Sequence, residues 1–71
     1  MRDKRLSKLA SNIKAERHRK GFTQDDLSEK IDVSTRSISL IENGYQTPSI
    51  FIVYDIAKAL EIDINELLKG I

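Results

Sequence analysis

The sequence is short of the residues on which many protein chemistries depend. Its 71 residues include no cysteine, no tryptophan and a single histidine, His18. The absence of cysteine excludes a disulfide framework, a thiolate zinc site and a cysteine nucleophile, and one histidine excludes a metal site built from several. No apolar run approaches the roughly 18 residues of a membrane span, and none follows the basic residues 1–5 as in a signal peptide. We therefore expect a cytoplasmic protein without metal, other cofactor, small-molecule ligand or membrane contact.

The net charge of +1 hides a strong asymmetry along the chain. Residues 1–20 carry eight Lys/Arg against two acids, a net charge of +6, whereas residues 21–71 carry four against nine, a net charge of −5. A positive N-terminal third on a small domain suggests an anionic partner. A solvated helix face is the alternative.

Apolar residues recur with the spacing of helices, and no useful length of chain alternates as a strand does. The first helix carries one stripe that ends in a charge: Leu6, Leu9, Ala10, Ile13 and Arg17. Gly21 ends this helix. Thr23 with Asp26 forms a capping box that opens a second helix, whose inward positions are Leu27 and Ile31. Ser34 caps a third helix that runs to about Asn43 and stops at Gly44.

The second half of the chain predicts two more helices. Thr47 is the expected N-cap of the fourth, with Pro48 in its first position. The inner face of that helix is spaced as Ile50, Val53, Ile56, Ala57 and Leu60. Asp63 with Glu66 forms another capping box and opens a short last helix through Leu67 and Leu68, ended by Gly70. We therefore predict an all-α fold of five helices, with residues 1–71 as one domain and no separate effector domain.

The second and third helices are joined by only about three residues. This connection is too short for two antiparallel packed helices, and it fits a helix-turn-helix at about residues 23–44. One face of the third helix holds Ile38, Ile41 and Glu42; the other holds Thr35, Arg36, Ser39, Leu40 and Asn43. The second face contains no acid, which suits a surface apposed to phosphates. An ordinary solvated face is again the alternative.

Two charged residues fall on faces that should be buried. Arg17 continues the apolar stripe of the first helix, and Glu42 lies one turn beyond Ile38 on the inner face of the third. Either residue would be costly to bury alone, but arginine can bind a carboxylate through two hydrogen bonds. We predict an Arg17–Glu42 ion pair that fixes the third helix against the first. Two side chains that reach out to solvent are the alternative.

The segments TQDDLS (23–28) and STRSISLIENG (34–44), followed by Pro48-Ser49, resemble the phage-repressor/Cro type of helix-turn-helix, the lambda-repressor-like family. The resemblance extends over roughly residues 6–69. It implies a compact bundle of about five helices that binds operator DNA as a dimer. Asp32 departs from the glycine usual in the turn, and Ser28 departs from the alanine common where the two helices cross.

The resemblance also assigns roles to individual residues. It matches Gln24, Ser34 and Asn43 to DNA phosphate contacts, and it matches Thr35, Arg36, Ser39 and Leu40 to positions that face base edges in the major groove. It matches Arg17 and Glu42 to a buried structural ion pair. Arg36 can donate two hydrogen bonds to guanine, and Leu40 suits a thymine methyl, with partial burial as its alternative. Thr35 and Ser39 are adaptable and carry little base preference alone.

Apolar residues beyond the needs of the core predict a dimer. Phe51 and Ile52 are not required on the inner face of the fourth helix, and Ile64, Leu68 and Ile71 add apolar surface nearby. A contiguous patch of this kind is rarely exposed without a partner. We predict a two-fold homodimer whose recognition helices lie about 34 Å apart on a palindromic site. A monomer whose core is completed by Phe51 and Ile52 is the alternative.

These observations favour a sequence-specific DNA-binding transcriptional regulator, and in particular a repressor. A restriction–modification controller and an antitoxin or mobile-element regulator are compatible variants. A protein-interaction module that keeps the fold without binding DNA is a second class. An enzyme requires a nucleophile–base pair or a metal set. We expect no enzyme, because His18 stands alone and Asp25-Asp26 is explained by the preference for acids at a helix N-terminus.

Overall fold

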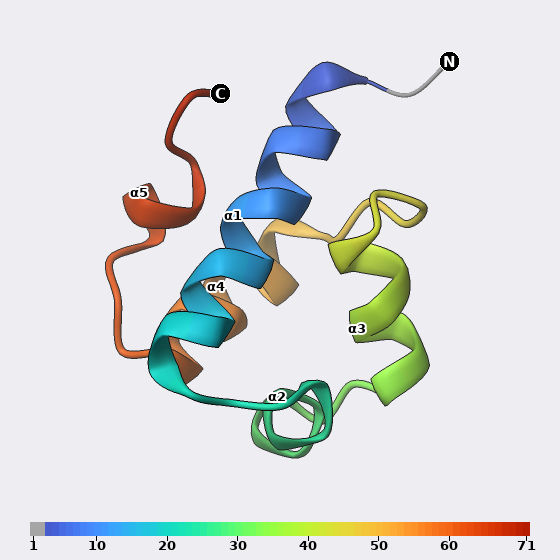
Figure 1. Cartoon of the computed structure of the whole chain (residues 1–71), viewed down its shortest axis with the longest axis vertical. Helices are drawn as coiled ribbons and strands as arrows, with labels where there is room; N and C mark the ends of the chain where they lie inside the picture. The colour runs from blue at the N-terminus through green and yellow to red at the C-terminus, as the bar shows by residue number, and fades with distance from the viewer. Residues whose placement is uncertain (1–2) are drawn as a thin grey trace.

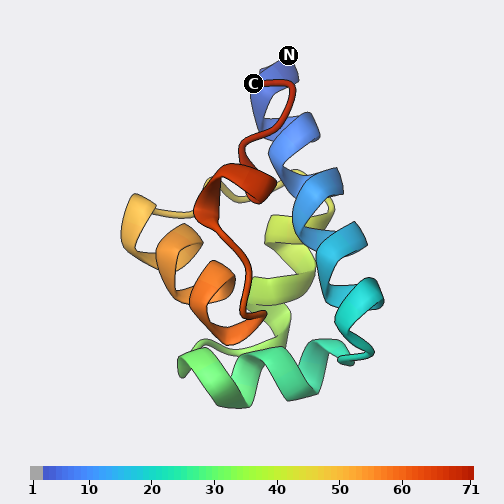
Figure 2. The ribbon, with the colours of Figure 1, turned by 90° about the vertical axis from the view of Figure 1, so that its left-hand side faces the viewer.

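The computed structural model describes residues 3–71; Met1 and Arg2, which begin the basic N-terminal segment, lie outside the described residues. The described chain forms five helices and no strand: α1 (Lys4–Lys20), α2 (Gln24–Ile31), α3 (Thr35–Glu42), α4 (Ile50–Ala59) and α5 (Ile64–Leu67). α2 lies across the base of the molecule, below the other four helices (Figures 1 and 2). The predicted all-α class and the order of five helices are confirmed.

The end of α1 and the starts of α2 and α3 lie at the capping residues that were predicted for them. Gly21 ends α1 in the left-handed region, with φ of 82°. Thr23 Oγ1 accepts from the backbone N–H of Asp26, and the Asp26 carboxylate accepts in return from the N–H of Thr23, which is a complete capping box. Ser34 caps α3 by accepting from the N–H of Ser37. These caps satisfy backbone donors that a helix N-terminus otherwise leaves without partners.

The start predicted for α4 is wrong by two residues. The N-cap is Ser49, whose Oγ accepts from the N–H of Ile52 at 3.2 Å, and the helix begins at Ile50. Pro48 is buried ahead of the cap instead of standing in the first helical position. The expected place of Ile50 on the inner face is wrong too, since this residue is 60% exposed in the first turn. The buried stripe of α4 therefore begins at Val53.

The last helix is also simpler than predicted. Asp63 caps α5 by accepting from the N–H of Asn65, but the carboxylate of Glu66 binds Lys69 Nζ at 2.8 Å instead of closing a capping box. Helical structure ends at Leu67, so Leu68 is the C-cap and lies exposed. Gly70 follows with φ of 77°.

The core lies between α1, α3, α4 and α5 and rests on α2. Its cluster of buried side chains comprises Ile13, Leu27, Ile38, Ile41, Val53, Ile56, Ala57, Leu60 and Leu67. Leu6, Leu9 and Ile31, which were expected on inward faces, are only half-buried. The short α5 is fixed to α1 by Asn12, whose Nδ2 donates to the carbonyls of Leu67 and Lys69, both at 2.9 Å.

Candidate nucleic-acid interface

The turn between α2 and α3 has the backbone that a helix-turn-helix needs. Asp32 ends α2 in the left-handed region, with φ of 57° and ψ of 43°. Aspartate tolerates this region better than most residues, so the departure from glycine leaves the turn intact. The N–H of Val33 donates to the carbonyl of Ser28, and Ser28 Oγ donates back to the carbonyl of Asp25. The chain then enters α3 within three residues.

The two faces of α3 separate as predicted. Ile38, Ile41 and Glu42 are buried against the rest of the bundle. The opposite face carries the residues assigned to DNA: Arg36 and Asn43 are exposed, and Thr35, Ser39 and Leu40 are half-buried. The structure thus brings all four predicted base-reading residues to one helix. Whether they touch bases stays a prediction.

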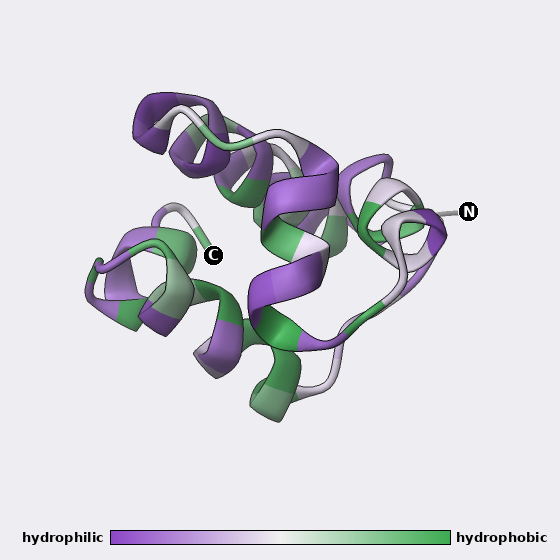
Figure 3. Cartoon of the chain, turned by 90° about the horizontal axis from the view of Figure 1, so that it is seen from below, coloured by the Kyte–Doolittle hydropathy of each residue, from purple (hydrophilic) through white to green (hydrophobic). Residues whose placement is uncertain are grey.

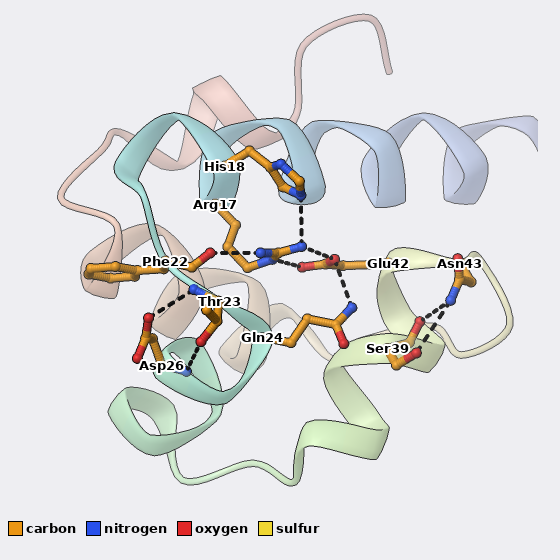
Figure 4. Close-up of polar contacts among 9 residues, drawn as sticks. All are labelled: Arg17, His18, Phe22, Thr23, Gln24, Asp26, Ser39, Glu42 and Asn43. Carbon is orange, nitrogen blue, oxygen red and sulfur yellow. Dashed lines mark hydrogen bonds and ion pairs between the residues drawn. The ribbon is translucent and has the colours of Figure 1, made fainter.

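A buried ion pair fixes the C-terminal turn of α3 to the C-terminal turn of α1 (Figure 4). Arg17 Nε donates to Glu42 Oε2 at 2.6 Å, and Arg17 Nη2 donates to Glu42 Oε1 at 3.0 Å. The two side chains are only 8% and 1% exposed. The remaining arm of Arg17 donates to the carbonyl of Phe22 at 2.7 Å. The pair predicted from the two stripes is therefore present and fully hydrogen-bonded, as a buried pair must be.

Gln24 joins this pair from the first turn of α2. Its Nε2 donates to Glu42 Oε1 at 3.2 Å, and the side chain is half-buried (Figure 4). A side-chain amide has two N–H donors, so one hydrogen remains for a phosphate. The contact with Glu42 holds the amide at the edge of the α3 surface, which is compatible with the predicted phosphate role.

The other two predicted phosphate contacts have partners within α3. Ser34 Oγ donates to Ser37 Oγ at 3.0 Å while it caps the helix. Asn43 Nδ2 donates to the carbonyl of Ser39 at 2.9 Å and approaches Ser39 Oγ at 3.4 Å (Figure 4). Both side chains are exposed at the two ends of α3. They flank the surface that is predicted to face bases, as the predicted phosphate contacts require.

Asp25 is part of this surface, and no sequence pattern identified it. Thr35 Oγ1 donates to Asp25 Oδ1 at 2.6 Å, and Thr35 Oγ1 also lies 3.1 Å from Ser28 Oγ. From the sequence, the acid was explained by its place at the N-terminus of α2. Asp25 and its partner Thr35 are ten residues apart and lie on either side of the turn, so the periodicity of α2 alone does not reveal the contact. A serine at the helix crossing and a threonine opening α3 were the available hints.

Two titratable residues, Asp26 and His18, have polar partners of their own. The backbone N–H of Thr23, followed by its side chain, holds the pKa of Asp26 below its usual range. His18 is exposed, and its Nε2 lies 3.0 Å from Arg17 Nη2 (Figure 4). Within residues 3–71, no three His, Cys, Asp or Glu side chains gather in a way that could hold a metal ion. No helix in that range is long and apolar enough to cross a membrane.

The residues predicted to form a dimer interface divide into two groups. Phe51, Leu68 and Ile71 are exposed, and Phe51 is the most exposed of them at 76%. Ile52 and Ile64 are half-buried and pack against the core. Ile50 and Tyr54, 60% and 55% exposed, extend the apolar surface of α4 beyond what was predicted. The ribbon of the first turn of α4 is coloured as hydrophobic at the edge of the molecule in Figure 3.

α2 and α3 are joined by a short turn, and α3 has one face buried against the bundle and the other accessible. This arrangement defines a helix-turn-helix protein. A model of the helix-turn-helix family HTH_3 matches residues 13–67. The chain belongs to this family, whose curated relatives are named as transcriptional regulators. The uncharacterized HTH-type transcriptional regulator YazB of Bacillus subtilis is 36% identical over 55 residues, which cover 78% of this chain and 80% of the relative.

Solved structures with this fold include two restriction–modification controller proteins. C.AhdI from Aeromonas hydrophila has a TM-score of 0.84 at 26% identity, over 87% of this chain and 94% of the other. Wild-type C.Esp1396I has a TM-score of 0.81 at 36% identity, over 89% and 85%. A structure of the C.Esp1396I nucleoprotein complex is similar as well, with a TM-score of 0.75 at 36% identity over 92% and 95%. The likeness therefore extends over nearly the whole length of both chains.

Proposed function

We propose that this protein is a sequence-specific DNA-binding transcriptional regulator, and specifically a repressor, that binds a palindromic operator as a homodimer. The observation that carries the proposal is the contrast between the two faces of α3. The buried face is fixed to α1 by the Arg17–Glu42 ion pair, and the opposite face carries exposed Arg36 and no acidic residue of α3. Family membership and the nucleoprotein complex of C.Esp1396I support the same interpretation. The protein acts in the cytoplasm, where it meets its DNA, and catalyses no reaction.

In this proposal α3 enters the major groove. Thr35, Arg36, Ser39 and Leu40 face the base edges, with Arg36 donating to guanine O6 and N7 and Leu40 touching a thymine methyl. Gln24, Ser34 and Asn43 contact phosphates and set the register of the helix without reading sequence. Because occupying a promoter site is enough to block transcription, repression is the simplest outcome of such binding.

The homodimer rests on the exposed apolar surface of α4 and the C-terminal segment. Phe51, Leu68 and Ile71 are exposed together with Ile50 and Tyr54. Aromatic and aliphatic residues of this kind are typical of the buried centre of an interface. Two copies related by a two-fold axis would place their α3 helices one DNA turn apart, about 34 Å.

Binding to a randomised duplex pool, followed by sequencing, tests the function. We expect a palindrome with half-sites about 10–11 base pairs apart. Arg36→Ala should relax the preference for guanine at one position of each half-site. Lys58→Ala removes a positive charge from an exposed position of α4 and should leave the motif unchanged. If the wild type selects no motif at low salt and Arg36→Ala alters nothing, the protein-interaction alternative replaces the regulator.

Sedimentation analysis tests the dimer separately. Phe51→Asp places a charge in the centre of the proposed interface and should convert dimers to monomers at micromolar concentration. Ser11→Asp adds the same charge at an exposed position of α1 and should leave the dimer intact. A wild-type protein that sediments as a monomer at every concentration, with or without DNA, would remove this part of the proposal.

Restriction–modification control is the second candidate, because two controller proteins share the fold over most of their length. Repression of an unrelated promoter and control of a restriction–modification operon use the same interface. The selected motif separates them: for a controller, it should occur upstream of an endonuclease or methyltransferase gene in the source genome.

A further inference from the structure

A cluster of three side chains joins α2 to the first residue of the recognition helix. Thr35 Oγ1 donates to Asp25 Oδ1 at 2.6 Å. Ser28 Oγ donates to the carbonyl of Asp25 at 2.9 Å and lies 3.1 Å from Thr35 Oγ1. Thr35 is half-buried, and it is one of the residues proposed to face a base edge. The cluster therefore acts on a residue that is proposed to read DNA.

The hydrogens of this cluster determine what Thr35 can offer to a base. A carboxylate accepts hydrogen bonds and does not donate, whereas a threonine hydroxyl has one hydrogen and two lone pairs. The short contact with Asp25 takes the single hydrogen of Thr35. The hydrogen of Ser28 goes either to the backbone carbonyl of Asp25 or to Thr35, and in neither case does Thr35 regain a donor. The hydroxyl is left as an acceptor only.

We infer that Asp25 is a specificity-determining positioning residue, which makes Thr35 an obligatory hydrogen-bond acceptor in the major groove. This inference rests on the proposed function. Among the groups that bases present there, the amino groups N6 of adenine and N4 of cytosine are donors, and O6 of guanine and O4 of thymine are acceptors. The base that faces Thr35 is therefore adenine or cytosine on the contacted strand. A guanine or thymine would bring its keto oxygen against a lone pair of Thr35 Oγ1, and the negative charge of the Asp25 carboxylate next to that hydroxyl would add to the repulsion.

This makes Thr35 more discriminating than a threonine hydroxyl is by itself. A free hydroxyl rotates and can donate or accept, so it accommodates every base. A hydroxyl whose hydrogen is already committed loses that freedom, because turning toward a keto oxygen would leave the Asp25 carboxylate without its partner. A neutral hydrogen bond contributes a net difference of roughly three- to tenfold in an equilibrium, and we expect a preference of that size.

The test compares binding sites selected by the wild type and by Asp25→Ala. The wild type should show roughly a three- to tenfold excess of adenine or cytosine at one position of each half-site. Asp25→Ala frees the hydrogen of Thr35, so guanine and thymine should become accepted at that position while the rest of the motif persists. Glu29→Gln removes an equal charge one turn further along α2 and should change the affinity for all sites together, without altering any single position.

A double-mutant cycle distinguishes positioning from a structural or purely electrostatic role. Thr35→Val removes the hydroxyl, so Asp25→Ala should have no effect on base preference in that background. Circular dichroism spectra confirm that each variant is folded. The inference is overturned if the wild type yields a clear motif that Asp25→Ala leaves unchanged, or if Asp25→Ala still alters the base preference in the Thr35→Val background. A wild type that yields no motif refutes the proposed function instead, so the two failures are distinguishable.

Discussion

Replacing Glu42 by alanine is the most informative single change to the stability of this fold. The Glu42 carboxylate accepts three hydrogen bonds, two from Arg17 and one from Gln24. Its loss leaves the guanidinium of Arg17 in a site where the side chain is 8% exposed. The bond from Arg17 to the Phe22 carbonyl remains, but it supplies no negative charge.

The expected cost follows from that uncompensated charge. Removing one partner of a buried ion pair destabilises a protein by about 3–5 kcal/mol. A chain of this length has a total free energy of unfolding of about 4–11 kcal/mol. Glu42→Ala should therefore remove about a quarter or more of the free energy of unfolding. If the wild type lies at the low end of its range and the cost at the high end, the variant would be largely unfolded at room temperature.

Urea denaturation followed by helical circular dichroism measures the effect. With a slope of about 1 kcal/mol per molar urea, the midpoint of Glu42→Ala should fall by about 3 M or more. Glu66→Ala removes an exposed pair with Lys69, whose side chain is 67% exposed, and should cost at most about 1 kcal/mol. A paired replacement, Arg17→Met with Glu42→Leu, should recover most of the stability. If Glu42→Ala costs no more than Glu66→Ala, the reasoning about burial is refuted.

Three further changes probe the caps and the phosphate contacts. Gly21→Ala should lower the free energy of unfolding by about 1–2 kcal/mol in urea titrations, because φ is 82° although no atom lies within 4 Å of the added Cβ. The pKa of Asp26 is lower in the folded state than in the unfolded state, where it is about 3.9. The ionised carboxylate therefore stabilises the fold above about pH 3.9, and this stabilisation is lost as the pH falls through the folded pKa. Thermal midpoints between pH 7 and 2 should therefore fall more steeply for the wild type than for Asp26→Asn. Gln24→Ala should weaken binding to every DNA site by a similar factor in fluorescence anisotropy titrations, and a changed motif would contradict its phosphate role.

The features predictable from sequence were those set by local chemistry. Gly21, the Thr23–Asp26 box and Ser34 each determine a helix terminus through groups within four residues of one another. The ion pair was also predictable, because a charge within an apolar stripe needs a partner of opposite sign, and Arg17 and Glu42 were a matching pair. These cases require only the helical period and the rule that buried polar groups have partners.

The errors arose where two local solutions compete or where a contact crosses a turn. Thr47 and Ser49 are both good N-caps on either side of Pro48, and burial of the proline selects Ser49. That choice depends on packing against the rest of the bundle, which the local sequence does not specify. The same packing leaves Ile50 outside the core. Asp25 was missed because its partner Thr35 comes near only after the α2–α3 turn has formed.

The bonds from Asn12 to the segment around Leu68 have a consequence for the spacing of DNA sites. Asn12 holds the carbonyls of Leu67 and Lys69, while Arg17, five residues along the same helix, holds the end of α3. Since an α-helix rises 1.5 Å per residue, these two anchors stay about 7.5 Å apart along α1. A dimer joined near Leu68 would therefore carry its two recognition helices at a single separation. Inserting one base pair between the half-sites rotates one of them by about 35° about the DNA axis. Two recognition helices at a fixed separation would not reach both half-sites after such an insertion. Binding by the proposed dimer would therefore depend on the spacing of the half-sites as well as on their sequence.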